Sequence, residues 1–171
     1  YAAQIGRWNR AVDDGTLVAP RVLAVGVAVR GPSPEEVEQQ VAEAGRAGAT
    51  FIKVFSSLSE PAWQALRKSA RANGLDYAGH VPARAFLLDS AREGLRSGEH
   101  LTQLNEACAP DEPAVIGARR QLDGDPLMAL RIAQDLPLMR AFDQALCDRV
   151  ARELATTGQA QVPTMVLAHA E

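Results

Sequence analysis

The feature that most constrains the fold is a repeated order of a helical stretch, a glycine and a short β-rich run. It occurs four times, as RAGATFIKVF with Gly48, ANGLDYAGHV with Gly74, REGLRSGEHL with Gly94 and TTGQAQVPTMVL with Gly158. A glycine directly after a helix adopts positive φ without strain and so ends the helix. The runs that follow lack polar alternation, which is typical of strands buried on both faces in a helix-covered parallel sheet. The pattern therefore predicts an α/β fold.

This punctuation predicts five strands, each connection carrying a helix, near residues 21–29, 50–56, 75–81, 96–102 and 160–168. Helices are expected at 2–13, from Ser33-Pro34, from Ser59-Glu60-Pro61, at 83–92 and at 138–156. Residues 103–137, which contain CAPDEPAV and LDGDP, form an insertion that we expect to be loop. The sheet is either an open doubly wound sheet or part of a barrel, because a full (β/α)8 barrel needs about 250 residues. We treat 1–171 as one partial catalytic domain.

Composition excludes several classes of protein. A net charge of -3 and a pI near 5.7 give no basic surface for nucleic acid. The longest apolar run, 22–29, is too short for a membrane span. Cys108 and Cys147 lack metal-ligand spacing, so we expect free thiols, with a disulfide as the alternative. The chain opens at Tyr1 in mid-helix style, so we expect a fragment or a processed chain and leave the compartment open.

Lys53 is an unexpected residue inside an apolar strand. Of 18 basic residues, only Lys53 and Lys68 are lysines. Lys53 lies near the carboxyl end of its strand, and His80 and His100 end the next two strands. Such ends meet at one edge, about 4.8 Å apart, and this edge holds the active site in α/β enzymes. A single histidine there is usually structural and a single lysine can reach solvent, but three equivalent positions favour a functional site.

The motifs GATFIKVFSSLSEPAW, GLDYAGHVP and SGEHLTQ resemble the metal-dependent amidohydrolase superfamily, in particular its imidazolonepropionase- and prolidase-like members. The resemblance runs over 15–166 and implies a distorted (β/α)8 barrel, of which this chain would supply strands three to seven. It implies that Lys53 carries a carbamate bridging two divalent metal ions, which we expect to be zinc. It also implies that His80 and His100 are metal ligands.

The sequence departs from the family pattern. It contains no His-x-His pair, and strands one, two and eight are missing, together with the expected catalytic aspartate. Relatives often have tyrosine at the position of Phe55. The resemblance therefore implies a fragment of a hydrolase that cleaves amide bonds of dipeptides or cyclic amides by metal-activated hydroxide. We expect the isolated chain to be inactive.

Other polar residues near these strand ends are weaker candidates. Ser56 and Ser57 follow the Lys53 strand and are candidates for substrate contact, as is Arg84 for a substrate carboxylate. We expect His169 to be an end-of-chain residue. Glu99 should point away from His100, because side chains alternate along a strand.

Two other functions stay open at this stage. Lys53 is suited to a Schiff-base lyase or aldolase, since desolvated lysines serve that chemistry. A non-catalytic barrel remnant is the third interpretation. The expected partner is a small-molecule or dipeptide-like substrate, and a homo-oligomer of the full-length protein is compatible with the sequence.

Overall fold

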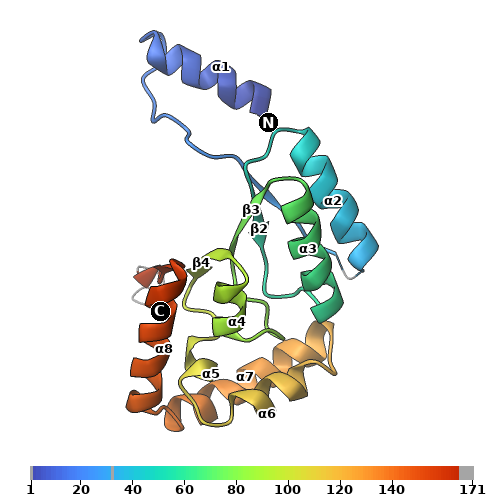
Figure 1. Ribbon diagram of the computed structural model, residues 1–171, viewed down its shortest axis with the longest axis vertical. Helices are drawn as coiled ribbons and strands as arrows, with labels where there is room; N and C mark the ends of the chain where they lie inside the picture. The colour runs from blue at the N-terminus through green and yellow to red at the C-terminus, as the bar shows by residue number, and fades with distance from the viewer. Residues whose placement is uncertain (1, 32, 166–171) are drawn as a thin grey trace.

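The computed structural model describes residues 2–31 and 33–165 of the 171-residue chain. It contains a parallel five-stranded sheet whose connections carry helices (Figure 1). The strands are β1 (Gly26–Ala28), β2 (Phe51–Val54), β3 (Asp76–Gly79), β4 (Leu95–Glu99) and β5 (Ala160–Val162). The helices are α1 (Ala2–Asp13), α2 (Pro34–Arg46), α3 (Glu60–Ala72), α4 (Leu87–Arg92), α5 (Leu104–Ala107), α6 (Glu112–Arg119), α7 (Gly124–Arg140) and α8 (Gln144–Thr157). The α/β class predicted from the sequence is confirmed.

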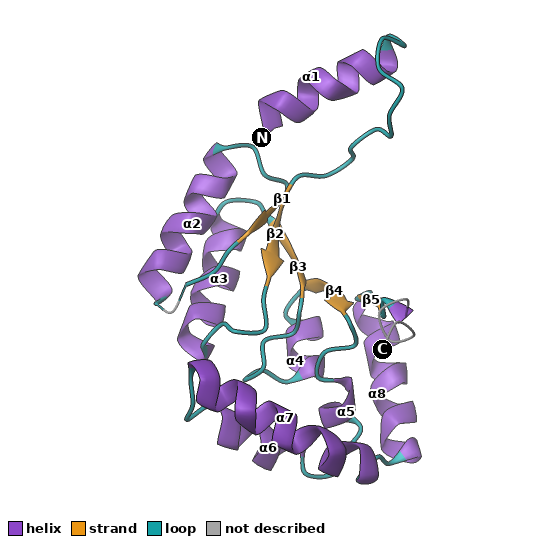
Figure 2. Ribbon diagram, turned by 180° about the vertical axis from the view of Figure 1, so that it is seen from behind, coloured by secondary structure: helices purple, strands orange, loops and turns teal. Residues whose placement is uncertain are grey.

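The strand order in the sheet follows the chain order from β1 to β5, and all neighbouring pairs are parallel. A doubly wound sheet reverses its order at a switch point, whereas successive units of a (β/α)8 barrel do not. The sheet is therefore compatible with part of a barrel. The arrows of β2 and β3 point toward the side where α5, α6 and α7 lie (Figure 2).

Helices cover one face of this sheet. Along β2 the buried residues are Ile52 and Val54, and they alternate with partly exposed Phe51 and Lys53. The buried face continues across the sheet through Tyr77. It packs on α2 and α3 in the core. The prediction of strands buried on both faces was wrong for the described residues, because the opposite, open face carries the polar side chains of the candidate site.

Local sequence signals explain where the helices α2 and α3 begin. The Ser33 hydroxyl accepts a hydrogen bond from the Glu36 backbone N–H at 3.2 Å. The Ser59 hydroxyl does the same for Ala62 at 3.3 Å. Both caps are followed by a proline in the first turn, which needs no backbone N–H there. These predicted helix starts are confirmed. The third predicted helix was too long, because α4 begins at Leu87 rather than near residue 83.

The insertion at 103–137 is helical, so the prediction of a loop was wrong. Pro113 lies in the first turn of α6. The LDGDP motif spans the start of α7, with Asp123 at its N-cap. These residues mark helix starts rather than loops. The single helix predicted over 138–156 is interrupted, because α7 ends at Arg140 and the Asp143 carboxylate caps α8 through the Leu146 N–H at 2.9 Å.

A disulfide joins Cys108, directly after α5, to Cys147 in α8. The expectation of free thiols was therefore wrong. The two cysteines lie 39 residues apart, and the helical insertion between them returns the chain so that their Cα atoms are 4.5 Å apart. Sequence spacing alone gives no sign of this return.

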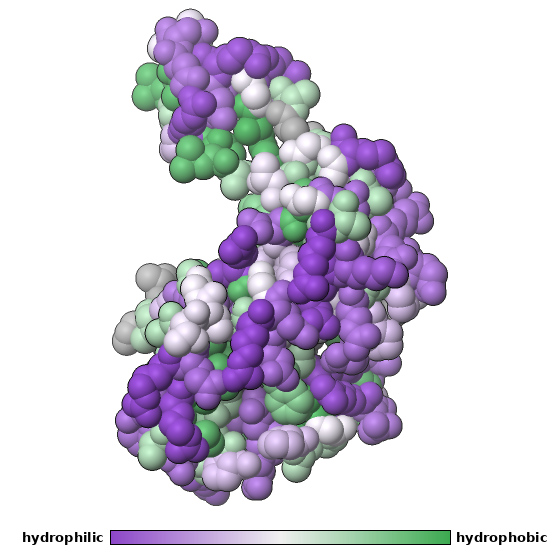
Figure 3. All heavy atoms as spheres, viewed as in Figure 1, coloured by the Kyte–Doolittle hydropathy of each residue, from purple (hydrophilic) through white to green (hydrophobic). Residues whose placement is uncertain are grey.

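The helix α1 stands apart from the rest of the molecule (Figure 1). Apolar side chains gather on it and on the segment that follows, as the upper part of Figure 3 shows. They include Trp8, Val12, Leu17 and Val22. Within the described residues, no helix combines the length and apolar character that crossing a membrane requires.

Candidate metal centre at the carboxyl ends of the strands

The structure brings Lys53, His80 and His100 together at the carboxyl ends of β2, β3 and β4. The ring centres of His80 and His100 lie 4.9 Å apart, in an edge-to-face arrangement. Lys53 contacts the Glu99 carboxylate, and His100 Nε2 lies 3.9 Å from the same carboxylate oxygen. Three consecutive β-strands therefore place these groups around one point, as parallel strands do.

Glu99 points into this group, so the expectation that it points away was wrong. Tyr77 pairs with Leu95, but Gly79 pairs with Gly98, so two residues of β3 span three of β4. This bulge shifts the alternation of β4 by one residue. The residue after Gly98 is therefore next to His80 on the open face. The expected alternation between Glu99 and His100 fails for a separate reason, because His100 does not have an extended backbone.

His100 lies in the same group of side chains because of its backbone conformation. Its backbone has φ 57°, in the left-handed region, so the chain leaves the extended conformation directly after Glu99. The His100 N–H donates to the Val162 carbonyl at 2.8 Å, and Nδ1 lies 2.6 Å from the Thr164 hydroxyl. β5 and the residues after it thus fix the orientation of the imidazole, and Nε2 is directed toward Glu99.

His80 has an unsatisfied nitrogen. Its Nδ1 is buried and has no hydrogen-bond partner among the described residues. Burial lowers the pKa of His80 to about 4, and the nearby positive charges of Lys53 and His100 add to this effect. The imidazole is therefore neutral at pH 7, the form in which histidine binds metals.

Gly79 permits the close approach of β3 to β2 just before His80. Its φ of 132° is a conformation that side chains rarely adopt. A Cβ atom there would lie 2.5 Å from the Val54 carbonyl oxygen and 3.1 Å from Lys53 Cδ. Glycine at this position therefore allows the backbone before His80 to lie close to Val54 and to the Lys53 side chain without a steric clash.

The donor set fits a divalent metal ion. One ligand atom each from His80, Glu99 and His100 can be chosen so that all lie within 4.8 Å of one another. Two imidazole nitrogens and a carboxylate oxygen are suitable ligands for zinc. The orphaned nitrogen of His80 is an independent sign that this group of side chains lacks a partner.

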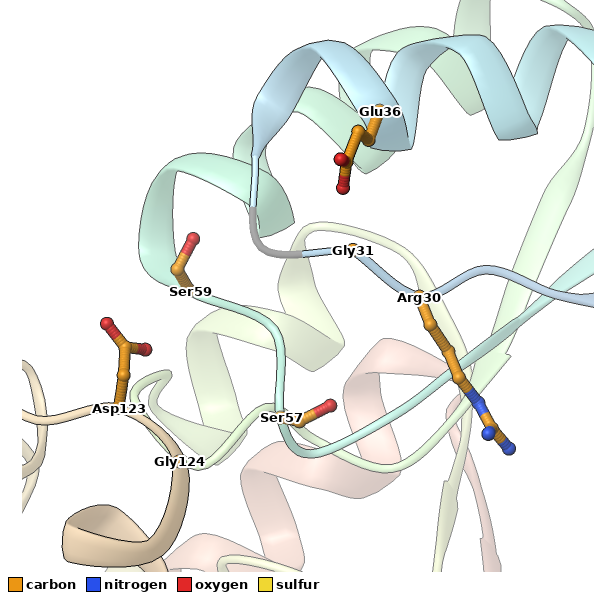
Figure 4. A pocket seen from close by; sticks show the side chains of 7 residues that line it. All are labelled: Arg30, Gly31, Glu36, Ser57, Ser59, Asp123 and Gly124. Atoms are coloured by element: carbon orange, nitrogen blue, oxygen red, sulfur yellow. The ribbon is translucent and has the colours of Figure 1, made fainter.

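The weaker sequence candidates lie in the segments that follow β2 and β3. Ser57 lines a cavity of about 630 Å³ between the carboxyl ends of β1 and β2 and the start of α7 (Figure 4). Ser56 lies in the same turn, and its carbonyl accepts from the Ala83 N–H at 2.9 Å. Arg84 is buried, and its guanidinium donates to main-chain carbonyls rather than toward the histidines. The prediction for His169 lies outside the described residues.

Comparisons with known proteins give only distant similarities. No family model matches the chain, and no curated protein does. Among solved structures, the chain is similar to a bottromycin amidohydrolase, with 18% identity and a TM-score of 0.48 over 90% of this chain and 48% of that one. It is also similar to an uncharacterized protein, with 17% identity and a TM-score of 0.44 over 91% and 50% of the two chains. The chain spans about half the length of both structures, and neither similarity assigns a family.

Proposed function

We propose that this chain provides the metal-binding part of a hydrolase that acts on carbon–nitrogen bonds of amides. The observation that supports the proposal is the meeting of His80, Glu99 and His100 at the strand ends, with Lys53 beside them. In this proposal the two imidazoles and the carboxylate hold the ion. A divalent ion such as zinc supplies Lewis-acid activation of the amide carbonyl and of water.

The residues around the ion would orient its ligands. Thr164 holds the His100 ring through Nδ1, as partners of ligating histidines do. Lys53 pairs with Glu99 and so helps to hold the carboxylate in place. We further propose that CO2 adds to the unprotonated amine of Lys53, whose pKa is lowered by burial. The nitrogen gives up a proton to solvent as the new C–N bond forms, and the product is an anionic carbamate. This carbamate would be a further ligand for the metal ion, beside Glu99.

Schiff-base chemistry on Lys53 is less well supported. A Schiff base needs an unprotonated amine, as carbamate formation does, so the protonation state of Lys53 does not distinguish the two reactions. The grouped donor atoms of His80, Glu99 and His100 support the metal-dependent reaction. No observation on the described residues favours a carbonyl substrate at this position. We therefore retain the hydrolase as the proposed function.

Metal binding by the purified chain tests the proposal. Elemental analysis and zinc titration calorimetry should show stoichiometric zinc in the wild-type chain and its loss in His80→Ala and Glu99→Gln. Glu38→Gln is the matched control, because Glu38 is exposed on α2 and is not one of the grouped donor residues. Intact mass spectrometry would detect the mass of one CO2 on Lys53, and hydrolysis of an amide panel by the full-length protein would test the reaction. Unchanged zinc affinity in both site variants would overturn the proposed centre.

A further inference from the structure

A row of side chains leads from the metal centre to β1. Arg30, Phe55 and His80 each lie two residues beyond a set of paired positions in β1, β2 and β3. They therefore share the open face of the sheet. The Arg30 guanidinium carbon is 4.1 Å from the centre of the Phe55 ring, and that centre is 5.4 Å from the centre of the His80 ring. Arg30 thus lies next to the candidate centre although sequence reasoning did not select it.

Arg30 is held in place at both ends. The Gln40 side chain accepts from the Arg30 backbone N–H at 2.9 Å and donates to its carbonyl. The Phe55 ring supports the guanidinium by a cation–π contact. Among the described residues, no carboxylate lies within ion-pair distance of this guanidinium. The planar group is therefore supported from one face and lacks an anionic partner.

The cavity beside Arg30 has the size of a small-molecule site. Its volume of about 630 Å³ lies within the range of about 300–1,000 Å³ that is common for such sites. Figure 4 shows the Ser57 hydroxyl on the side of the cavity where Arg30 lies. The Asp123 carboxylate in this cavity is already paired with Arg84. The full lining is Arg30, Gly31, Glu36, Ser57, Ser59, Asp123 and Gly124.

We propose that Arg30 is a specificity-determining residue that binds an anionic group, in particular a carboxylate, on the amide substrate. Arginine pairs with carboxylates through two parallel hydrogen bonds, and stacking on an aromatic ring presents its N–H edge for that purpose. An extended peptide spans about 3.3–3.6 Å per residue, so the row, with its spacings of 4.1 and 5.4 Å, places the carboxylate within about three residues of the scissile bond. This inference rests on the proposed function for the position of that bond.

Binding without turnover tests Arg30 separately from the metal chemistry. The probes are N-acetyl-L-alanine and its uncharged amide, titrated by NMR into the zinc-treated and the chelator-treated chain. The wild-type chain should bind the acid more tightly than the amide. Arg30→Ala should weaken binding of the acid about 10- to 100-fold, the range for a lost hydrogen bond to a charged group, and leave the amide unchanged. Arg30→Lys should show an intermediate loss, because it retains charge without the planar fork.

Arg46→Ala is the matched control, since it removes the same charge from an exposed position at the far end of α2. Arg30 is exposed, so its substitution should leave thermal stability and zinc affinity unchanged. Equal affinity for acid and amide in the wild type would refute the role of Arg30. An equal loss of affinity for the acid in Arg30→Ala and Arg46→Ala would refute it too. Absence of zinc binding with an intact Arg30-dependent preference would instead refute the proposed metal centre alone.

Discussion

Replacing Arg84 should lower the free energy of unfolding of the chain, and not only weaken substrate binding. The side chain is 3% exposed, and its donors are directed at several segments that are distant in sequence. They contact the carbonyls of Ser57 at 3.2 Å, Leu58 at 3.1 Å, Arg119 at 3.3 Å and Leu122 at 3.1 Å, and the Asp123 carboxylate. Arg84 therefore joins the loop after β2 to the insertion that follows β4.

The size of the effect follows from these contacts. Each hydrogen bond from a charged donor contributes about 1.5–3 kcal/mol, but the contributions are not additive and water reaches part of the site once the side chain is removed. We expect Arg84→Ala to lower the free energy of unfolding by about 3–5 kcal/mol, the range for an arginine removed from a buried, paired position. For a chain of this length, that corresponds to a fall in Tm of about 10 °C.

Urea denaturation and thermal melting of Arg84→Ala, Arg84→Met and wild type measure this directly. Arg84→Met keeps the apolar stem, so the difference between the two variants separates packing from hydrogen bonding. The reasoning fails if Arg84→Ala unfolds within about 1 kcal/mol of wild type, the scale of an ordinary surface substitution. A stable Arg84→Ala chain that loses affinity for N-acetyl-L-alanine would instead support the substrate contact expected from the sequence.

Three further predictions concern stability. Reduction of Cys108–Cys147 should cost about 4 kcal/mol by the chain-entropy relation for a 39-residue separation, measured by denaturation with and without reductant. Burial raises the pKa of Glu112 from its ordinary value of 4.5 to about 7, so protonation of Glu112 favours the folded chain. The stabilisation that protonated Glu112 gives is fully present below pH 4.5 and is lost as the pH rises through 7. Glu112→Gln should therefore be more stable than wild type by about 1–2 kcal/mol at pH 8, and no difference between their pH–stability curves would contradict this. Gly79→Ala should destabilise the chain by about 3 kcal/mol or more, because a Cβ atom would collide with the Val54 carbonyl at positive φ; an unchanged melting temperature would refute this.

The order of elements was predictable because the helix caps and terminal glycines are local signals. The helix over 2–13 is confirmed, and Ser33 and Ser59 cap the helices they were expected to start. The pairing of His80 with His100 was also predictable, since equivalent positions in successive parallel units must meet at one edge of the sheet.

The remainder depends on tertiary contacts that leave no local signal. The disulfide exists because α6 and α7 return the chain, and neither cysteine marks that path in the sequence. Arg30 was not selected because its contact is with Phe55, which lies directly after the neighbouring strand β2. Arg84 follows the GHVP motif of His80, but burial turns its guanidinium toward carbonyl groups. In each case the residue type was visible and its partner was not.

The bulge in β4 has a consequence for how such a site changes by insertion and deletion. In an unbroken strand, Leu95 and Glu99 would face the same side, because residues four apart share a face. The extra residue lets one strand bury Leu95 in the core and present Glu99 beside His80. A single-codon deletion at Ser97 would leave both side chains in the sequence but force them to compete for one face. The number of residues in this strand, and not only their identity, therefore determines which side chain is offered as a ligand.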